Sequence, residues 1–143
     1  MHMSIKKITW LGLRLAMGFI FLWAFIDKLF GLGFATTSKN AWLNGGSPTS
    51  GFLTNATHGP LAEFFKELAG IPTVDWLFML GLLGVGVTLL FNKFVTWGAM
   101  AGSVMLLLMY LAVLPPANNP LIDDHIVYIF VLVLLALRNQ ENR

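Results

Sequence analysis

The sequence predicts an all-α integral membrane protein, in which four helices form an antiparallel transmembrane bundle and a long outer loop carries a short interfacial helix. Hydrophobic residues make up 57% of the 143 residues and charged residues only 11%, with a mean hydropathy of +0.74. In addition, four apolar stretches approach or exceed the roughly 17–25 residues that a helix needs to cross a bilayer. A chain of this length is expected to form one domain, residues 1–143.

The four apolar stretches cover residues 8–32, 74–91, 94–114 and 121–137. Only Asn92 and Lys93 lie between the second and the third stretch, so these two are expected to form a tight helical hairpin. Both stretches also contain small residues at intervals that allow close helix packing in lipid. These small residues are Gly81, Gly84, Thr88, Gly98, Gly102 and Ser103.

Basic residues are distributed unevenly between the two ends of these stretches. If the stretches alternate in direction, one side carries Lys6, Lys7, Lys93, Arg138 and Arg143, and the other carries Lys28, Lys39 and Lys66. Because cytoplasmic loops are enriched in lysine and arginine, we expect a multi-pass protein of the cell membrane with both termini in the cytoplasm. The first apolar stretch is too long for a cleavable signal peptide and predicts a retained signal anchor.

The composition excludes several classes of function. The absence of cysteine removes thiol–disulfide exchange, thiolate metal ligation and cysteine nucleophiles. The basic residues form no continuous stripe, so nucleic-acid binding is not expected. No two histidines have the spacing of a metal site, and no metal is predicted.

A long outer segment, residues 34–72, separates the first two apolar stretches. Its first half is rich in turn formers, but apolar residues such as Trp42 and Phe52 interrupt it, which favours a lid on the membrane surface over a flexible linker. Residues 60–70 predict a short amphipathic helix that lies along that surface rather than a fifth span. Its apolar face comprises Leu61, Phe64, Phe65 and Leu68.

A cluster of ionisable side chains opens the last apolar stretch and is the main candidate for chemistry. Asp124, His125 and Tyr128 share one face of a helix, while Asp123 points about 100° away. A carboxylate, an imidazole and a phenol are groups that relay protons and hydrogen-bond a quinone carbonyl. The alternative is structural, because acidic residues in a first turn stabilise the helix dipole and an interfacial tyrosine is an ordinary membrane anchor.

Two basic residues of the first stretch are candidates for binding an anionic or carbonyl group. Arg14 lies about two turns inside the stretch, where it either extends to the cytoplasmic interface or faces the bundle. Lys28 follows Asp27 on the outer side, level with Asp75 and residues 123–125. The alternative for Lys28 is a local ion pair with one of these carboxylates.

Several runs of the sequence resemble one known family. They are Leu13-Arg14-Leu15-Ala16-Met17-Gly18 with Asp27-Lys28-Leu29, Trp42-Leu43-Asn44-Gly45-Gly46-Ser47-Pro48, Trp76-Leu77-Phe78-Met79-Leu80-Gly81, and Asn119-Pro120-x-x-Asp123-Asp124-His125. Over nearly the whole chain these runs resemble the DoxX/DoxD membrane proteins, and the Gly-Gly-Ser-Pro loop resembles the DoxD branch. The resemblance implies a DoxX/DoxD-like domain of four transmembrane helices with a quinone-linked role. The DoxD branch is known as the membrane subunit of thiosulfate:quinone oxidoreductase, which couples thiosulfate oxidation to quinone reduction.

The resulting hypothesis is a quinone-linked subunit of a membrane oxidoreductase that oxidises a small sulfur compound such as thiosulfate. In it, the carboxylates and the imidazole would manage the protons of the quinone, a basic residue would stabilise charge, and the outer loop would close over the ring. The expected catalytic residues are Asp123, Asp124 and His125, and the expected quinone-binding residues are Arg14, Lys28, Trp42 and Tyr128.

The expected partners follow from this hypothesis. They are membrane lipid, quinone, a small anionic sulfur substrate and a second protein subunit, and a homo-oligomer is also compatible with the sequence. Without cysteine the sulfur compound cannot be held as a persulfide, so it would be bound non-covalently, by a cofactor or by the second subunit. The alternative is a non-enzymatic membrane scaffold or a lipid-binding subunit of a larger redox complex.

Overall fold

A computed structural model of the chain describes residues 4–141, whose regular secondary structure is entirely helical. The four long helices are α1 (Ile5–Phe30), α4 (Pro72–Leu90), α5 (Val95–Ala112) and α6 (Asp124–Glu141). Between α1 and α4 lie the 3₁₀-helices η1 (Ser38–Asn40) and η2 (Trp42–Asn44) and the short helices α2 (Ser50–Asn55) and α3 (Ala62–Glu67). The long helices agree with the four predicted apolar stretches to within a few residues at each end.

Three of the long helices have the character of membrane spans. Among residues 4–141, α1, α4 and α5 are long and apolar enough to cross a membrane, which confirms the prediction of a membrane protein at this level. Helix α6 has a similar length of 18 residues. It differs because Asp124 lies in its first turn and both Arg138 and Glu141 lie near its end.

The ends of these helices follow from local sequence. The side-chain oxygen of Ser4 accepts the backbone N–H of Lys7 at the start of α1. Gly31 ends the same helix in the left-handed conformation, with φ of 65°, which a glycine adopts without steric cost. Pro72 occupies the first turn of α4, where its missing N–H leaves no hydrogen bond unmade.

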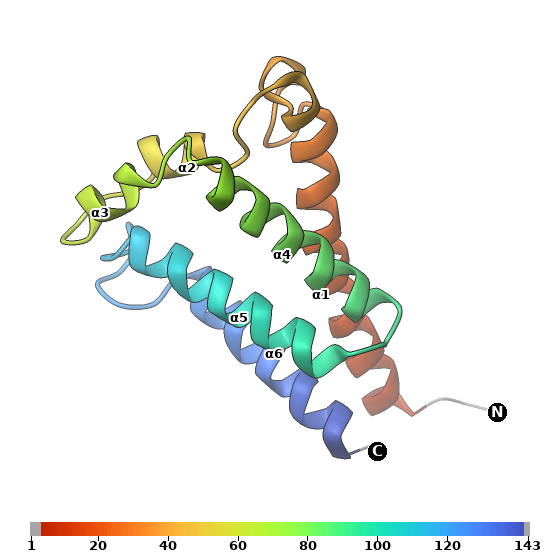
Figure 1. The fold of residues 1–143 in the computed structure, drawn as a ribbon. Helices are drawn as coiled ribbons and strands as arrows, with labels where there is room; N and C mark the ends of the chain where they lie inside the picture. Colours follow the sequence, from red (N-terminus) through yellow and green to blue (C-terminus); the bar gives the residue numbers. More distant parts are fainter. Residues whose placement is uncertain (1–3, 142–143) are drawn as a thin grey trace.

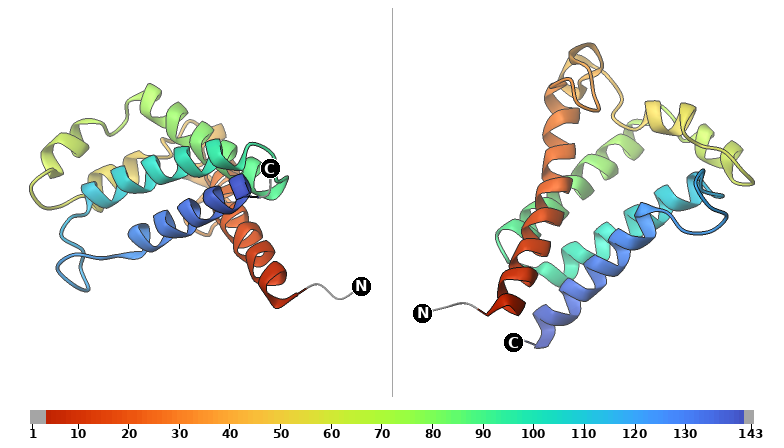
Figure 2. Two further views of the ribbon diagram at one scale, coloured as in Figure 1. Left: turned by 90° about the horizontal axis from the view of Figure 1, so that it is seen from below. Right: turned by 180° about the vertical axis from the view of Figure 1, so that it is seen from behind.

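The long helices pack as two antiparallel pairs, α1 with α4 and α5 with α6, joined through contacts between α4 and α5. The first turn of α1 and the last turn of α6 lie at the same end of the molecule, which we call the terminal end (Figure 2). The two pairs diverge toward the opposite end, the loop end, where α2 and α3 lie across the opening (Figure 1). The fold therefore resembles a wedge that is closed at the terminal end.

The hydrophobic core lies where all four long helices meet. Its fully buried side chains include Met79, Val85 and Leu89 of α4 and Leu132 of α6, each with no exposed surface. Packed around them are Met17 and Phe21 of α1, Leu82 of α4, Val95, Ala99 and Leu106 of α5, and Leu135 of α6.

The turn between α4 and α5 confirms the predicted hairpin. Asn92 and Phe94 both adopt a left-handed φ of 56°, which asparagine tolerates better than most residues. The N–H of Lys93 donates to the carbonyl of Thr88 over 3.1 Å, so the end of α4 is closed by the turn itself.

Small residues allow the long helices to approach closely at some of the predicted positions. Gly98 of α5 lies so near Thr88 that a Cβ atom would collide with the threonine side chain, and a Cβ on Gly102 would lie 2.9 Å from Leu132 of α6. Gly86, which the sequence analysis did not single out, allows α1 and α4 to approach closely, since a Cβ there would lie 2.8 Å from the backbone nitrogen of Leu22. Gly84 faces open space, so the packing role predicted for it is wrong.

The connecting segment between α1 and α4, residues 31–71, is ordered by short helices rather than extended over the surface. The predicted amphipathic helix at residues 60–70 is confirmed in its central part by α3, in which Phe65 is buried and Phe64 is exposed. Helix α2 was not predicted. Its Leu53 packs with Phe65 and Ala112 of α5, so α2 and α3 share a second, smaller apolar cluster with α5.

Two glycines two residues apart on α4 provide a matched test of this packing. We expect Gly86→Ala to destabilise the protein by about 1–3 kcal/mol, because the added methyl group meets the backbone of α1. Gly84→Ala should be neutral or stabilising by up to about 1 kcal/mol, since it adds helix propensity without a collision. Equal losses of thermal stability in detergent for the two variants would contradict the packing described here.

Candidate functional site

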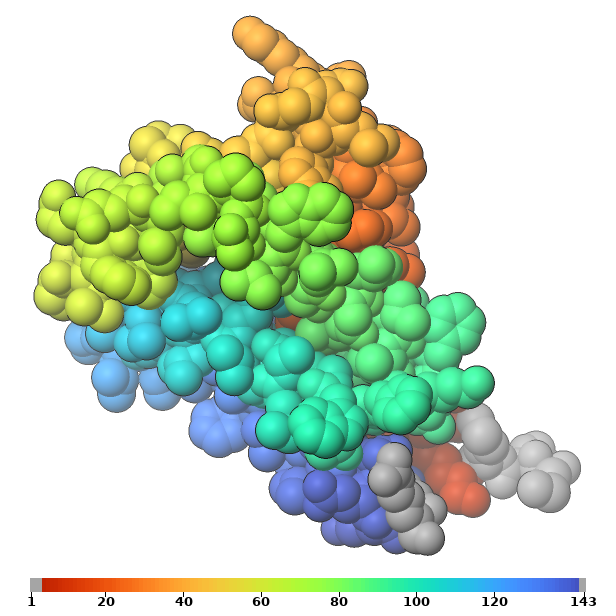
Figure 3. Space-filling view, viewed as in Figure 1, coloured from red at the N-terminus to blue at the C-terminus, as the bar shows by residue number. Residues whose placement is uncertain are grey.

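A large cavity lies in the opening of the wedge, between α4 and α5 and beneath α2 and α3. It has a volume of about 1220 Å³. The space-filling view shows the surface hollowed between these elements (Figure 3). Ligand pockets for small molecules typically measure about 300–1,000 Å³, so this cavity is large enough for an extended apolar ligand.

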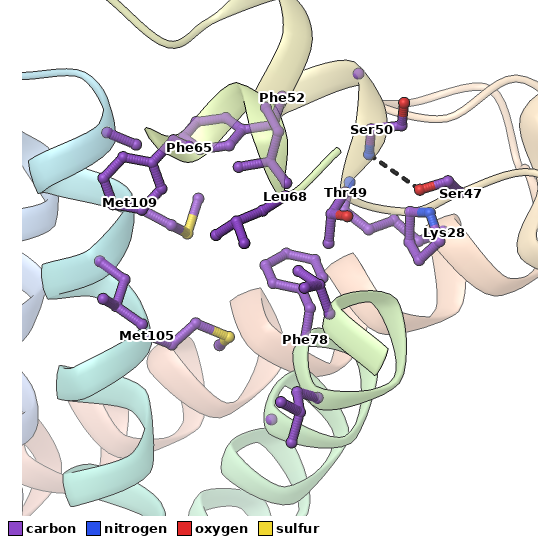
Figure 4. A pocket seen from close by; sticks show the side chains of 18 of the residues that line it. Lys28, Ser47, Thr49, Ser50, Phe52, Phe65, Leu68, Phe78, Met105 and Met109 are labelled. Carbon is purple, nitrogen blue, oxygen red and sulfur yellow. Dashed lines mark hydrogen bonds between the residues drawn. The ribbon is translucent and has the colours of Figure 1, made fainter. Parts of the chain in front are cut away.

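The walls of the cavity are apolar and rich in aromatic and methionine side chains. Phe65 from α3 and Phe78 from α4 face Met105 and Met109 from α5 across the cavity (Figure 4). Methionine is flexible and polarizable, and its sulfur makes favourable contacts with aromatic rings, so such a wall adapts to the shape of a ligand. The remaining apolar lining includes Phe52, Leu53, Leu68, Val74, Leu77, Trp97, Met100, Val104 and Leu108.

The cavity opens sideways between the two helix pairs. Several of its lining residues are themselves widely exposed, among them Leu77 of α4 at 68% and Trp97 of α5 at 70%. Because α4 and α5 are candidate membrane spans, the apolar side chains exposed on them are suited to contact with lipid. The geometry therefore provides a lateral entrance for a ligand that is dissolved in the bilayer.

One end of the cavity is polar. It is lined by Lys28 from α1 together with Thr36, Ser47, Thr49 and Ser50 of the connecting segment (Figure 4). Lys28 is half-buried, and its ammonium group makes no hydrogen bond or ion pair with another residue among those the structure describes. A cation and several hydroxyl groups thus adjoin a long apolar chamber, which is the arrangement that an amphiphilic ligand requires.

The carboxylate of Asp27 orders the chain beside Lys28. It is almost fully buried and accepts three successive backbone N–H groups, from Phe34 at 3.2 Å, Ala35 at 2.9 Å and Thr36 at 2.8 Å. A buried carboxylate is tolerated only when such donors satisfy it. These bonds fold the chain after α1 back onto the helix and bring Thr36 to the cavity.

Asp75, in the first turn of α4, orders a second part of the connecting segment. Its carboxylate accepts the hydroxyl groups of Ser47 at 2.8 Å and Thr49 at 2.6 Å, and also the N–H of Thr49 at 3.2 Å. The oxygen of Ser47 in turn accepts the N–H of Ser50 over 3.2 Å, the bond drawn in Figure 4. The start of α2 is therefore fixed over the cavity by a buried acidic residue of α4.

His58 connects the turn between α2 and α3 to the end of α5. Its Nε2 lies 2.7 Å from the carbonyl of Pro115 and its Nδ1 lies 3.1 Å from the carbonyl of Ala56. Its backbone N–H donates to the carbonyl of Ala112 over 3.2 Å. Since both ring nitrogens face acceptors, the protonated ring satisfies both, and the carbonyls of Pro115 and then Ala56 raise the pKa of His58 above its usual value.

The predicted catalytic cluster lies at the start of α6, away from the cavity. Among the described residues, none that lines the cavity comes from α6. The carboxylate of Asp123 accepts the N–H of His125 at 3.0 Å, as a helix cap does, and its other oxygen lies 2.6 Å from Nδ1 of the same residue, which pairs the carboxylate with the imidazole. Asp124 is exposed, and Tyr128 packs against the main core. A role of these four residues in chemistry stays a prediction.

The other predicted site residues are placed apart from one another. Arg14 donates from Nη1 to the carbonyls of Leu89 and Leu90 at the end of α4, which is near the terminal end. It is separated from Lys28 by 14 residues of α1, or about 21 Å along the helix axis, so the two cannot bind the same polar group. Trp42 packs edge-on against Trp76, with ring centroids 4.6 Å apart, and is not part of the cavity lining. Of the predicted residues, only Lys28 lines the cavity.

The residues that the sequence analysis missed are mainly the apolar ones on α5. Met105 and Met109 are four residues apart and therefore lie on one side of the helix, whereas Met100 lies at the opposite edge of the face that lines the cavity. The four-residue spacing of Met105 and Met109 was the only signal that the sequence offered for these residues. Among the described residues, no three His, Asp or Glu side chains gather closely enough to hold a metal ion.

No family model, no curated protein and no solved structure matches this chain. The resemblance to the DoxX/DoxD proteins therefore stays a prediction from the sequence runs that carry it.

The contacts of His58 predict a pH dependence of the α2–α3 turn. A raised pKa in the folded state means that the stabilisation is complete below the unfolded value of about 6.5 and is lost as the pH rises through the folded value. We expect hydrogen-exchange protection of residues 56–59, corrected for the intrinsic rate, to fall as the pH rises through the raised pKa of His58, above about 6.5. His58→Gln should abolish this pH dependence and His125→Gln should retain it. An unchanged pH profile in His58→Gln would refute the assignment.

Proposed function

We propose that the protein binds a quinone in the cavity between α4 and α5 and acts as the quinone-linked subunit of a membrane oxidoreductase. The observation that carries this proposal is the combination of a long apolar chamber, a lateral opening and a polar end that contains Lys28. A quinone has the matching chemistry, because its isoprenoid tail is apolar and its ring carries two carbonyl acceptors.

In this proposal, polar and apolar residues of the cavity bind different parts of the quinone. Lys28 would donate a charge-assisted hydrogen bond to one quinone carbonyl, and such bonds are roughly twice as strong as neutral ones. The hydroxyl of Ser50 is available as a second donor, whereas those of Ser47 and Thr49 already donate to Asp75. Phe78, Met105 and the other apolar residues would enclose the ring and the tail. A bound quinone supplies an acceptor for two electrons and two protons.

The electron donor in this proposal is a small sulfur compound such as thiosulfate, as the resemblance to the DoxD branch suggests. Because the chain contains no cysteine, no protein persulfide can form on it. A second subunit that binds and oxidises the donor is therefore part of the proposal. The acidic and histidine residues at the start of α6 would take part only in moving protons to or from that partner.

The proposal includes the arrangement of the chain in the membrane. We infer that α6 crosses the bilayer beside α5, with Asp124 at one interface and both Arg138 and Glu141 at the other, so that four helices form the transmembrane bundle. The excess of basic residues at the terminal end supports a cytoplasmic location for both termini in the cell membrane. The cavity would then lie in the outer leaflet beneath the connecting segment.

A first test measures the polar contact. In Lys28→Met we expect the Kd for a benzoquinone with one isoprenoid unit to rise about tenfold or more, because a hydrogen bond to a charged group contributes roughly 1.5–3 kcal/mol. Lys39→Met removes the same charge from an exposed residue outside the cavity and should change the Kd less than twofold. Quenching of tryptophan fluorescence provides the measurement, since Trp97 lines the cavity.

The apolar chamber is tested by filling it. Met109→Trp places a larger side chain in the cavity, whereas Leu107→Trp places it on an exposed position of α5 outside the lining. Quinone that remains with the purified protein should fall in the first variant and persist in the second. If both variants retain quinone equally, the quinone is not bound in this cavity.

The same experiments separate this proposal from the non-enzymatic alternative, a lipid-binding or scaffold subunit. A phospholipid chain would also fit an apolar chamber of this size. If the wild-type protein binds no quinone but retains phospholipid that Met109→Trp excludes, the cavity serves lipid and the proposed redox role is wrong.

A further variant tests whether the start of α6 belongs to the binding site. We expect His125→Ala to leave the Kd for quinone unchanged within about twofold, because none of the described residues lining the cavity comes from α6. A role in proton transfer would instead appear as a loss of turnover of about 10²-fold or more at unchanged binding. Weaker quinone binding in His125→Ala would move the site to α6.

A further inference from the structure

A second groove, at the terminal end of the molecule, carries a different chemistry. It has a volume of about 340 Å³ and is bounded by the first turns of α1, the α4–α5 turn and the last turns of α6. Its lining contains three basic residues, Lys7, Arg14 and Arg138, and two amides, Asn92 and Asn139. It contains no acidic residue within the described part of the chain.

The basic residues are brought together by contacts between helices. The guanidinium of Arg138 on α6 lies 5.1 Å from the ring centroid of Trp10 on α1, within the range of a cation–π contact. Arg14 is held by Nη1, which donates to the carbonyls of Leu89 and Leu90. Only one of its three nitrogens is used in these two bonds, so the remaining N–H donors can serve a ligand.

The charge of the whole molecule is polarised in the same direction. Within residues 4–141, the terminal end carries five basic residues and one acidic residue, whereas the loop end carries three basic and six acidic residues. The acidic residue at the terminal end is Glu141, which is exposed and does not line the groove. An anion is therefore attracted to this end by the long-range field as well as by the groove itself.

We propose that this groove binds an oxyanion, and that its position favours the phosphate of an anionic phospholipid. Basic pockets between membrane helices at the cytoplasmic side are suited to such headgroups, and Trp10 has the amphipathic character of an interfacial residue. Leu11 lines the same groove and is exposed at 37%, so an apolar surface for an acyl chain continues from the charged residues. A soluble oxyanion such as inorganic phosphate has the same headgroup chemistry and is the other source.

Two pairs of variants with the same change in net charge test this site. The double variant Lys7→Gln/Arg138→Gln removes two charges from the groove. The control Lys6→Gln/Lys93→Gln removes two charges from the same end of the molecule, at exposed positions outside the groove. Full-length protein in neutral detergent is titrated separately with dioctanoyl phosphatidylglycerol, dioctanoyl phosphatidylcholine and inorganic phosphate, and the thermal unfolding temperature is followed.

We expect phosphatidylglycerol, and not phosphatidylcholine, to stabilise the wild-type protein. Its apparent affinity should fall about 30-fold in the groove variant and less than threefold in the control, as expected for two basic residues near an anionic headgroup. An equal fall in both variants would show a non-specific charge effect and overturn the proposal, as would the absence of any stabilisation of wild type. Stabilisation by inorganic phosphate alone, lost in the groove variant, would support the oxyanion site and assign it to a soluble ligand.

The single variants keep the test valid if Arg138→Gln impairs folding by removing the contact with Trp10. Lys7 and Lys6 are adjacent, both are exposed, and only Lys7 lines the groove. Lys7→Gln should weaken the response to phosphatidylglycerol about fivefold, Lys7→Arg should restore it, and Lys6→Gln should leave it unchanged. Equal effects of Lys7→Gln and Lys6→Gln would again overturn the proposal.

Discussion

The carboxylate of Asp27 is the group on which the organisation of the loop end depends. Backbone N–H groups that lie outside regular helices and away from water need acceptors within the protein, and three successive N–H groups of residues 34–36 donate to this one side chain. Asp75 likewise accepts the N–H and the hydroxyl group of Thr49, the residue directly before α2. Together these carboxylates hold the connecting segment in the position in which its residues Thr36, Ser47 and Thr49 line the polar end of the cavity.

Much of the fold was predictable because the physical constraint of a bilayer acts directly on sequence. Helix lengths, the hairpin at Asn92 and Lys93, and the close packing at Gly98 follow from apolar runs, short connections and small residues. The cavity was not predictable in the same way. Helices α4 and α5 are apolar on every side. The face that packs, the face that meets lipid and the face that lines the cavity therefore have the same composition. For this reason, hydrophobic periodicity in the sequence does not separate them.

The candidate site was hard to predict for a different reason, because the same polar residue can serve either the structure of the fold or its chemistry. A carboxylate near the start of a helix suits both capping and catalysis, and the sequence of residues 123–125 is equally compatible with either. One contact of Asp123 with His125 is that of a cap, and the other pairs its carboxylate with the imidazole ring, so the structure contains both arrangements. Arg14 is a similar case, because a basic residue inside an apolar stretch suggests a ligand, whereas its contacts include the carbonyls that end α4.

Adjacent residues of opposite charge explain why Lys28 remains available to a ligand. Neighbouring positions on a helix point about 100° apart, so Asp27 faces the connecting segment while Lys28 faces the cavity. Had the carboxylate lacked its three backbone donors, an ion pair with the nearby ammonium would have been the natural way to satisfy it. In the structure, three backbone N–H groups satisfy the carboxylate of Asp27 instead. The positive charge of Lys28 therefore remains at the polar end of the cavity.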